Sequence, residues 1–153
     1  MPRVRLVVRP VGVSRSGRLR VRIFTGPDAS EQYSIDPSRI TALYRVNQDG
    51  LYNVYIVEYE TDNPDFELYR RSSEYAASLI PRAKRVDSVR FVETRYDRYS
   101  DMETEIYYRL WPGGVERVCK QVIQIDADDY CVVYTTCPIP PGSEDDVPFC
   151  DDY

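Results

Sequence analysis

Histidine is absent from the 153 residues of this chain. Without an imidazole, the sequence cannot build a Ser-His-Asp or Cys-His nucleophile or a histidine-based metal site. It also lacks a Cys-x-x-Cys pair and any run of the ~20 apolar residues that a membrane-spanning helix needs. No motif indicates a reaction. We therefore expect a protein that is not an enzyme, with no metal, no cofactor and no membrane span.

Lysine is nearly absent as well, because eighteen of the twenty basic residues are arginine. The charges are unevenly distributed: the first 27 residues hold seven arginines and no acid, whereas residues 121–153 hold eight acids and no basic residue. Guanidinium groups favour planar, multidentate pairing with carboxylates, although codon usage alone would also enrich arginine. The polarity predicts that the two ends attract each other, within one molecule or between neighbouring copies.

Short alternating segments between turn residues predict a mostly β protein. In residues 3–9 and 18–23 arginine alternates with aliphatic residues, which predicts an antiparallel hairpin with an arginine face and an apolar face. Residues 26–38 are expected to form a loop. Further strands are predicted over residues 40–46, 51–60, 86–96, 104–111, 115–125 and 130–136.

One helix is predicted over about residues 64–80, between the fourth and fifth strands. Asn63 is expected to cap it, and Pro64 suits its first position. The predicted fold is therefore an antiparallel β-sandwich or barrel of about eight strands with one helix. Residues 1–137 are expected to form a single β-rich domain, followed by an extended, acidic, proline-rich tail over residues 138–153.

All four cysteines lie in the last 35 residues, and an even number in one region favours two disulfides. If Ile125 pairs with Tyr130 across the last turn, Cys119 lies opposite Thr136. A small adjustment then favours the pairs Cys119–Cys137 and Cys131–Cys150 among three connectivities. Disulfides indicate an oxidising compartment, a particle surface or a hyperthermophile's cytoplasm.

The start of the chain, Met-Pro-Arg-Val-Arg, has no apolar signal core of 7–15 residues. Either a leader has been removed, or the protein leaves the cell without one, through lysis or assembly into a particle. Together with the disulfides, this gives the expectation of an extracellular or virion location.

The oppositely charged ends form the main candidate interaction surface. Binding to nucleic acid is disfavoured, because the residues between the arginines are aliphatic and no aromatic side chains are available to stack on bases. Pairing with carboxylates is the preferred interpretation, and an ordinary solvated face is the alternative. The candidate residues are Arg3, Arg5, Arg9, Arg18, Arg20 and Arg22 on the basic side, and Glu144, Asp145, Asp146, Asp151 and Asp152 on the acidic side.

Other polar and aromatic groups have simpler interpretations. Asp126, Asp128 and Asp129 lack the spacing of a calcium loop and suit a hairpin turn. A second acidic group is better explained by an ion-pair ladder at a sheet rim than by a general acid/base pair. The fourteen tyrosines could line a cavity or contact other subunits, with core packing expected for about half of them. The acidic group assigned to the ion-pair ladder comprises Glu58, Glu60, Asp62, Glu103 and Glu105.

Residues 125–137 resemble the second motif of the lipocalins, a turn followed by a strand with spaced tyrosines and a terminal cysteine. Asp126, Tyr130, Tyr134 and Cys137 match it, whereas Ile125 and Ala127 replace a threonine and a tyrosine. The Gly-x-Trp segment of that family is missing from the start of the chain. The resemblance implies a barrel that holds a small hydrophobic ligand.

The sequence thus favours a non-enzymatic structural or assembly subunit of a virion or an extracellular filament. Its expected partners are copies of itself or another structural subunit, contacted through the basic hairpin and the acidic tail. The alternative is a lipocalin-like barrel, and a carboxylate-based hydrolase is a third possibility.

Overall fold

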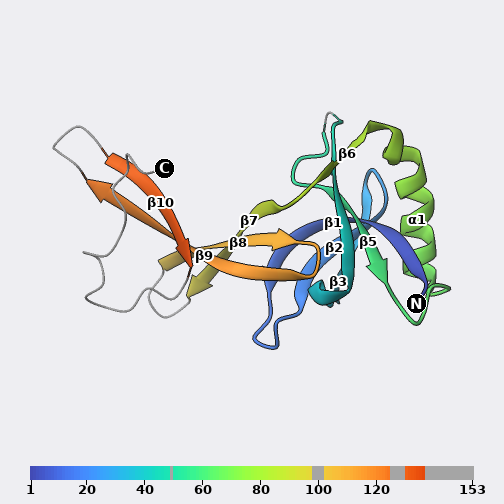
Figure 1. Cartoon of the computed structure of the whole chain (residues 1–153), viewed down its shortest axis with the longest axis horizontal. Coiled ribbons are helices and arrows are strands. Elements are labelled where there is room, and N and C mark those ends of the chain that lie inside the picture. The colour runs from blue at the N-terminus through green and yellow to red at the C-terminus, as the bar shows by residue number, and fades with distance from the viewer. Residues whose placement is uncertain (49, 98–101, 125–129, 137–153) are drawn as a thin grey trace. The chain divides into compact units, whose positions relative to one another are not determined.

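The computed structural model describes residues 1–48, 50–97, 102–124 and 130–136 (Figure 1). The chain divides into two compact units. One contains residues 1–91 and 110–115, and the other contains the described residues of 92–109 and of the chain from 116 onward. The predicted boundary between a β-rich domain and an acidic tail stays a prediction, because residues 137–153 lie outside the described ranges.

The first unit is built on a six-stranded antiparallel sheet in the order β3-β2-β1-β5-β4-β6. Since β3 and β6 are edges, this sheet is open. No closed barrel occurs among the described residues, so a barrel is not supported, and a sandwich stays a prediction. The strands are β1 (Arg3–Val13), β2 (Leu19–Gly26), β3 (Ala29–Ile35), β4 (Ile40–Val46), β5 (Tyr55–Glu60) and β6 (Ala83–Val86).

The hairpin predicted from the alternation of residues 3–23 is confirmed as the β1–β2 pair. The expected loop over residues 26–38 is wrong in its middle, because Ala29–Ile35 forms strand β3. Most side chains of β3 are exposed, as in an edge strand, so the segment carries almost no apolar alternation. The strand β6 was also not predicted, and the described residues therefore contain ten strands rather than about eight.

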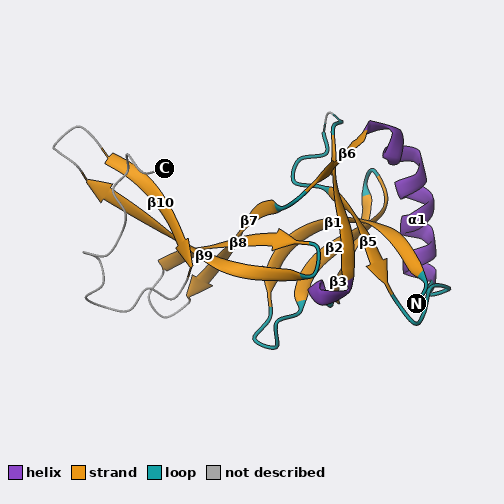
Figure 2. Ribbon diagram, viewed as in Figure 1, coloured by secondary structure: helices purple, strands orange, loops and turns teal. Residues whose placement is uncertain are grey.

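Helix α1 (Glu67–Leu79) lies within the predicted range 64–80 and contacts β1 and β2 (Figure 2). The expectation that Asn63 caps it is wrong. Phe66 occupies the N-cap position without a side-chain cap, and the Asn63 carbonyl oxygen accepts a 3.2 Å hydrogen bond from the Phe66 N–H. After α1, the 3-10 turn η2 (Ile80–Arg82) places Pro81 in its first turn, so the α-helix ends there.

Strand β1 is buried on both of its faces, since Leu6, Val7 and Val8 are all fully buried. Val7 shares its face with the arginines of β1, so the predicted arginine face is partly covered. Val7 packs in one cluster with Phe24 of β2 and with Ala76 of α1. The face of the sheet that carries the arginines of β1 and β2 therefore also contains a buried apolar contact and is not entirely exposed to solvent.

The second sheet has four strands in the order β10-β9-β8-β7. Their bounds are β7 (Val89–Asp97), β8 (Met102–Trp111), β9 (Gly114–Gln124) and β10 (Tyr130–Thr136). The turn between β8 and β9 needs glycine twice: Gly113 has a φ of +100°, and a Cβ on Gly114 would lie 2.8 Å from the Trp111 ring.

The register of β9 and β10 differs from the predicted one by a residue. Tyr130 pairs with Gln124 rather than with Ile125, and Cys119 therefore lies opposite Thr135 rather than Thr136. Cys137 and Cys150 lie outside the described residues, so the two disulfides stay predictions. Cys131 lies opposite Ile123, four residues along β9 from Cys119 and thus about 13 Å away, which disfavours a bond between these two.

Candidate interaction surface

The first two arginines of β1 pair with carboxylates of the neighbouring strand β5. In the β1–β5 register Arg3 lies opposite Glu60, and Arg5 lies opposite Glu58. The Nε atoms of the two arginines are 3.5 and 3.4 Å from the glutamate oxygens. Glu58 and Glu60 thus form ion pairs as expected, although on β5, an interior strand, rather than at the rim of the sheet. The partial exposure of these groups makes each pair worth little stability.

Arg9 and Arg22 lie directly opposite each other on β1 and β2 and are half-buried. Arg9 donates from Nη2 to the Tyr52 carbonyl oxygen at 3.3 Å, and its guanidinium carbon lies 5.2 Å from the centre of the Phe24 ring. Arg22 donates from Nε to Ser30 Oγ at 2.9 Å and from Nη2 to the Ser30 carbonyl oxygen at 3.2 Å. The hydrogen-bond acceptors of both arginines are therefore neutral.

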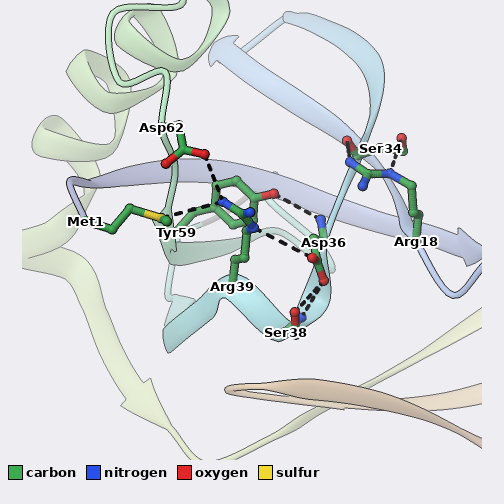
Figure 3. A network of polar contacts seen from close by, with 8 residues as sticks. All are labelled: Met1, Arg18, Ser34, Asp36, Ser38, Arg39, Tyr59 and Asp62. Atoms are coloured by element: carbon green, nitrogen blue, oxygen red, sulfur yellow. Dashed lines mark hydrogen bonds and ion pairs between the residues drawn. The ribbon is translucent and has the colours of Figure 1, made fainter.

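Arg18, directly before β2, repeats the arrangement of Arg22 (Figure 3). It donates from Nε to Ser34 Oγ at 3.2 Å and from Nη2 to the Ser34 carbonyl oxygen at 3.1 Å. Its charge also acts on nearby Asp36. The hydrogen bond from the Ser38 side chain is the main cause that lowers the pKa of Asp36, and the charges of Arg39 and Arg18 lower it further.

A second group of contacts in Figure 3 surrounds Arg39 and Tyr59. Arg39 lies between two carboxylates, with Nε 3.7 Å from Asp36 and Nη1 3.9 Å from Asp62. The Tyr59 hydroxyl oxygen accepts a 3.0 Å hydrogen bond from the Asp36 N–H. These contacts fix the 3-10 turn η1 (Pro37–Arg39) against β5, and their role is structural.

The predicted arginine surface therefore has two parts that the sequence did not separate. Arg3 and Arg5 are compensated by carboxylates of β5, whereas Arg9, Arg18 and Arg22 are held by carbonyl and hydroxyl oxygens. Arg20 is half-buried opposite Gly12, at the bulge in β1. The acidic candidates all lie outside the described residues, so their pairing with the arginines stays a prediction: Glu144, Asp145, Asp146, Asp151 and Asp152.

A buried carboxylate that was not among the predicted site residues lies on β7. Glu93 is 5% exposed and accepts hydrogen bonds from Arg95 Nε at 2.7 Å and from the Tyr108 hydroxyl at 3.0 Å. Burial raises the pKa of Tyr108, and the bond to Glu93 raises it further. The Glu93-x-Arg95 spacing was a usable signal, because residues two apart share a strand face. The arrangement is a paired charge within one sheet.

The tyrosines divide between core and surface. Tyr69 of α1 packs edge-on against Tyr33, Tyr59 and Phe66, with ring centres 6.0, 6.0 and 4.9 Å away. Burial is the main cause that raises the pKa of Tyr69. Tyr52, in contrast, is 77% exposed beside Arg9. Tyr33 and Tyr59 therefore pack against Tyr69, whereas Tyr52 is available for contact with another molecule.

The described residues hold no cluster of three or more acids or cysteines that could bind a metal ion. The Asp126, Asp128 and Asp129 turn lies outside them. Within the same part of the chain, no helix is long and apolar enough to cross a membrane.

No protein-family model, curated protein or solved structure matches the chain.

Proposed function

We propose that the protein is a non-enzymatic structural subunit of a virion or an extracellular filament. It associates with copies of itself or with another structural subunit, and its basic β1–β2 hairpin contacts acidic segments such as the C-terminal tail. The proposal is supported by the charge polarity of the chain and by the way in which the hairpin holds its arginines.

The observation that carries the proposal is that Arg9, Arg18 and Arg22 are fixed by neutral acceptors. A guanidinium group has five N–H donors, and one or two are used in each of these contacts. The remaining donors can bind a carboxylate from outside. Because these arginine side chains are already ordered, they would lose less conformational entropy when a partner binds, which is the advantage of a preorganised surface.

Salt-dependent assembly of the full chain tests this function. We expect native mass spectrometry and light scattering to show oligomers at about 50 mM salt that dissociate at about 1 M, where charge interactions are screened within a few ångströms. A monomer under both conditions, at high protein concentration, would overturn the proposal.

The contribution of the acidic tail can be tested with a matched control. Neutralising the five tail acids to Asn and Gln should abolish the low-salt oligomers. Neutralising five exposed acids of the first unit removes the same charge and should leave them intact. Equal loss in both variants would show that net charge, rather than the tail, controls assembly. The control positions are Glu31, Asp65, Glu67, Glu74 and Asp87.

A further inference from the structure

Two arginines face each other at the centre of the β1–β2 hairpin. Arg9 and Arg22 are direct partners in the register, so their Cβ atoms lie about 4.5–5.5 Å apart on one face of the sheet. Like charges in this position repel and destabilise a sheet unless an anion compensates them. No carboxylate bonds to either of them among the described residues.

Both arginines share a face of the sheet with Phe24, which lies opposite Val7 on β2 and two residues from Arg22. Arg9 lies over the Phe24 ring at 5.2 Å. The fork of Arg22 is bonded to Ser30, which is the partner of Phe24 in the β2–β3 register. Two cations from neighbouring strands thus lie on one face of the sheet, one over the buried Phe24 ring and one fixed beside it on Ser30. Their half-buried positions strengthen their interaction with an anion relative to fully exposed arginines.

The chemistry of this pair favours a carboxylate over a nucleic acid. Phe24 is 6% exposed and is already covered by Arg9, so its ring cannot stack on a base. Planar forks suit the two oxygens of a carboxylate. The densest run of carboxylates in the chain is Glu144-Asp145-Asp146, in a segment with no basic residue.

We infer that Arg9 and Arg22 form a carboxylate-binding site that receives residues 144–146 of a second copy of this chain. The inference rests on the proposed function and specifies its contact. It assigns the binding to this pair rather than to Arg3 and Arg5, whose charges Glu60 and Glu58 already compensate.

A binding experiment separates the two pairs of arginines. The receptor is the full chain with its five tail acids neutralised, and the probe is a fluorescent peptide of residues 138–153. We expect R9Q/R22Q to weaken binding by at least about tenfold, because each lost charged hydrogen bond corresponds to about that factor. The matched control, R3Q/R5Q, removes the same charge from the same hairpin and should change the affinity by less than about twofold. Equal weakening in both variants would overturn the inference.

A separate control for folding is needed, because Arg9 packs on a core residue and its substitution could destabilise the fold. R9K/R22K retains both charges but loses the planar forks. We expect it to melt like the unsubstituted chain and to bind the peptide with intermediate affinity. Full affinity in this variant would overturn a fork-specific site.

Mixing shows whether the tail comes from a second copy. R9Q/R22Q and the tail-neutralised chain should each remain monomeric, while their mixture should give heterodimers by native mass spectrometry. A mixture of monomers only, with the unsubstituted chain also monomeric, means that the proposed function fails. If the unsubstituted chain assembles and R9Q/R22Q assembles equally well, the function stands and this site is wrong.

Discussion

The Tyr75 hydroxyl is buried and has no hydrogen-bond partner among the described residues. Burial raises the pKa of Tyr75, and the charge of Asp28 raises it further. A buried, unpaired hydroxyl costs free energy, so Tyr75→Phe should increase the free energy of unfolding by about 1 kcal/mol, as measured by urea denaturation. Tyr44→Phe is the matched control, because it removes a hydroxyl that donates to Glu58 at 3.0 Å and should lower stability. A loss of stability in Tyr75→Phe would contradict this view of the hydroxyl.

At the residue scale, the sequence predicted which side chains share a face but not what they contact. The alternation of residues 3–9 correctly placed the arginines on one side of β1. Their partners Glu58 and Glu60 lie more than fifty residues away, and only the β1–β5 register brings them close. The neutral acceptors Tyr52 and Ser30 carry no charge that a sequence pattern could have matched to an arginine.

Among the elements, α1 hydrogen-bonds to the backbone of β1. The buried Ser72 Oγ accepts a 2.9 Å hydrogen bond from the Val7 N–H, and Ser73 Oγ donates to the Arg5 carbonyl oxygen at 2.8 Å. Ser72→Ala leaves a buried N–H unpaired and should lower the free energy of unfolding by about 1–3 kcal/mol. In the control Ser78→Ala, only an exposed bond to the Tyr75 carbonyl oxygen is lost, and the change should stay within about 0.5 kcal/mol. Faster hydrogen exchange at the Val7 amide in Ser72→Ala would locate the effect, and unchanged exchange would argue against it.

The elements that the sequence predicted are those with a strong local signal. The alternation of the first hairpin and the proline after α1 are such signals. Strand β3 had none, because its polar sequence becomes a strand only through pairing with β2 along seven residues that the register joins. The shifted β9–β10 pairing has a similar cause, since the predicted register extended the pairing one residue further along β9, to Ile125 instead of Gln124.

At the scale of the whole molecule, the sequence predicted the β-rich class but not the division into two units. Charge and alternation are continuous across residues 89–118, so no composition change marks the division. The open sheet likewise follows from strand order, which a single sequence does not specify. The distribution of charge between the ends was readable directly, and it motivates the proposed function.

Tyrosine burial makes the stability of the whole fold sensitive to alkaline pH. Burial is the main cause that raises the pKa of Tyr55, Tyr69, Tyr75 and Tyr108 above the ordinary value of 10.0. The folded state therefore keeps these protons at pH values where the unfolded chain releases them. Their contribution to stability is complete below about pH 10 and is lost as the pH rises above it.

We therefore expect the free energy of unfolding to fall steadily as the pH rises from about 10 to about 12. Denaturation at several pH values, with phenolate absorbance recorded alongside, measures both quantities. Tyr69→Phe should flatten the fall, because it removes one of the groups whose folded and unfolded pKa values differ. A constant free energy over this range, or complete tyrosine ionisation in a chain that stays folded, would show that these hydroxyls are not buried in the native state.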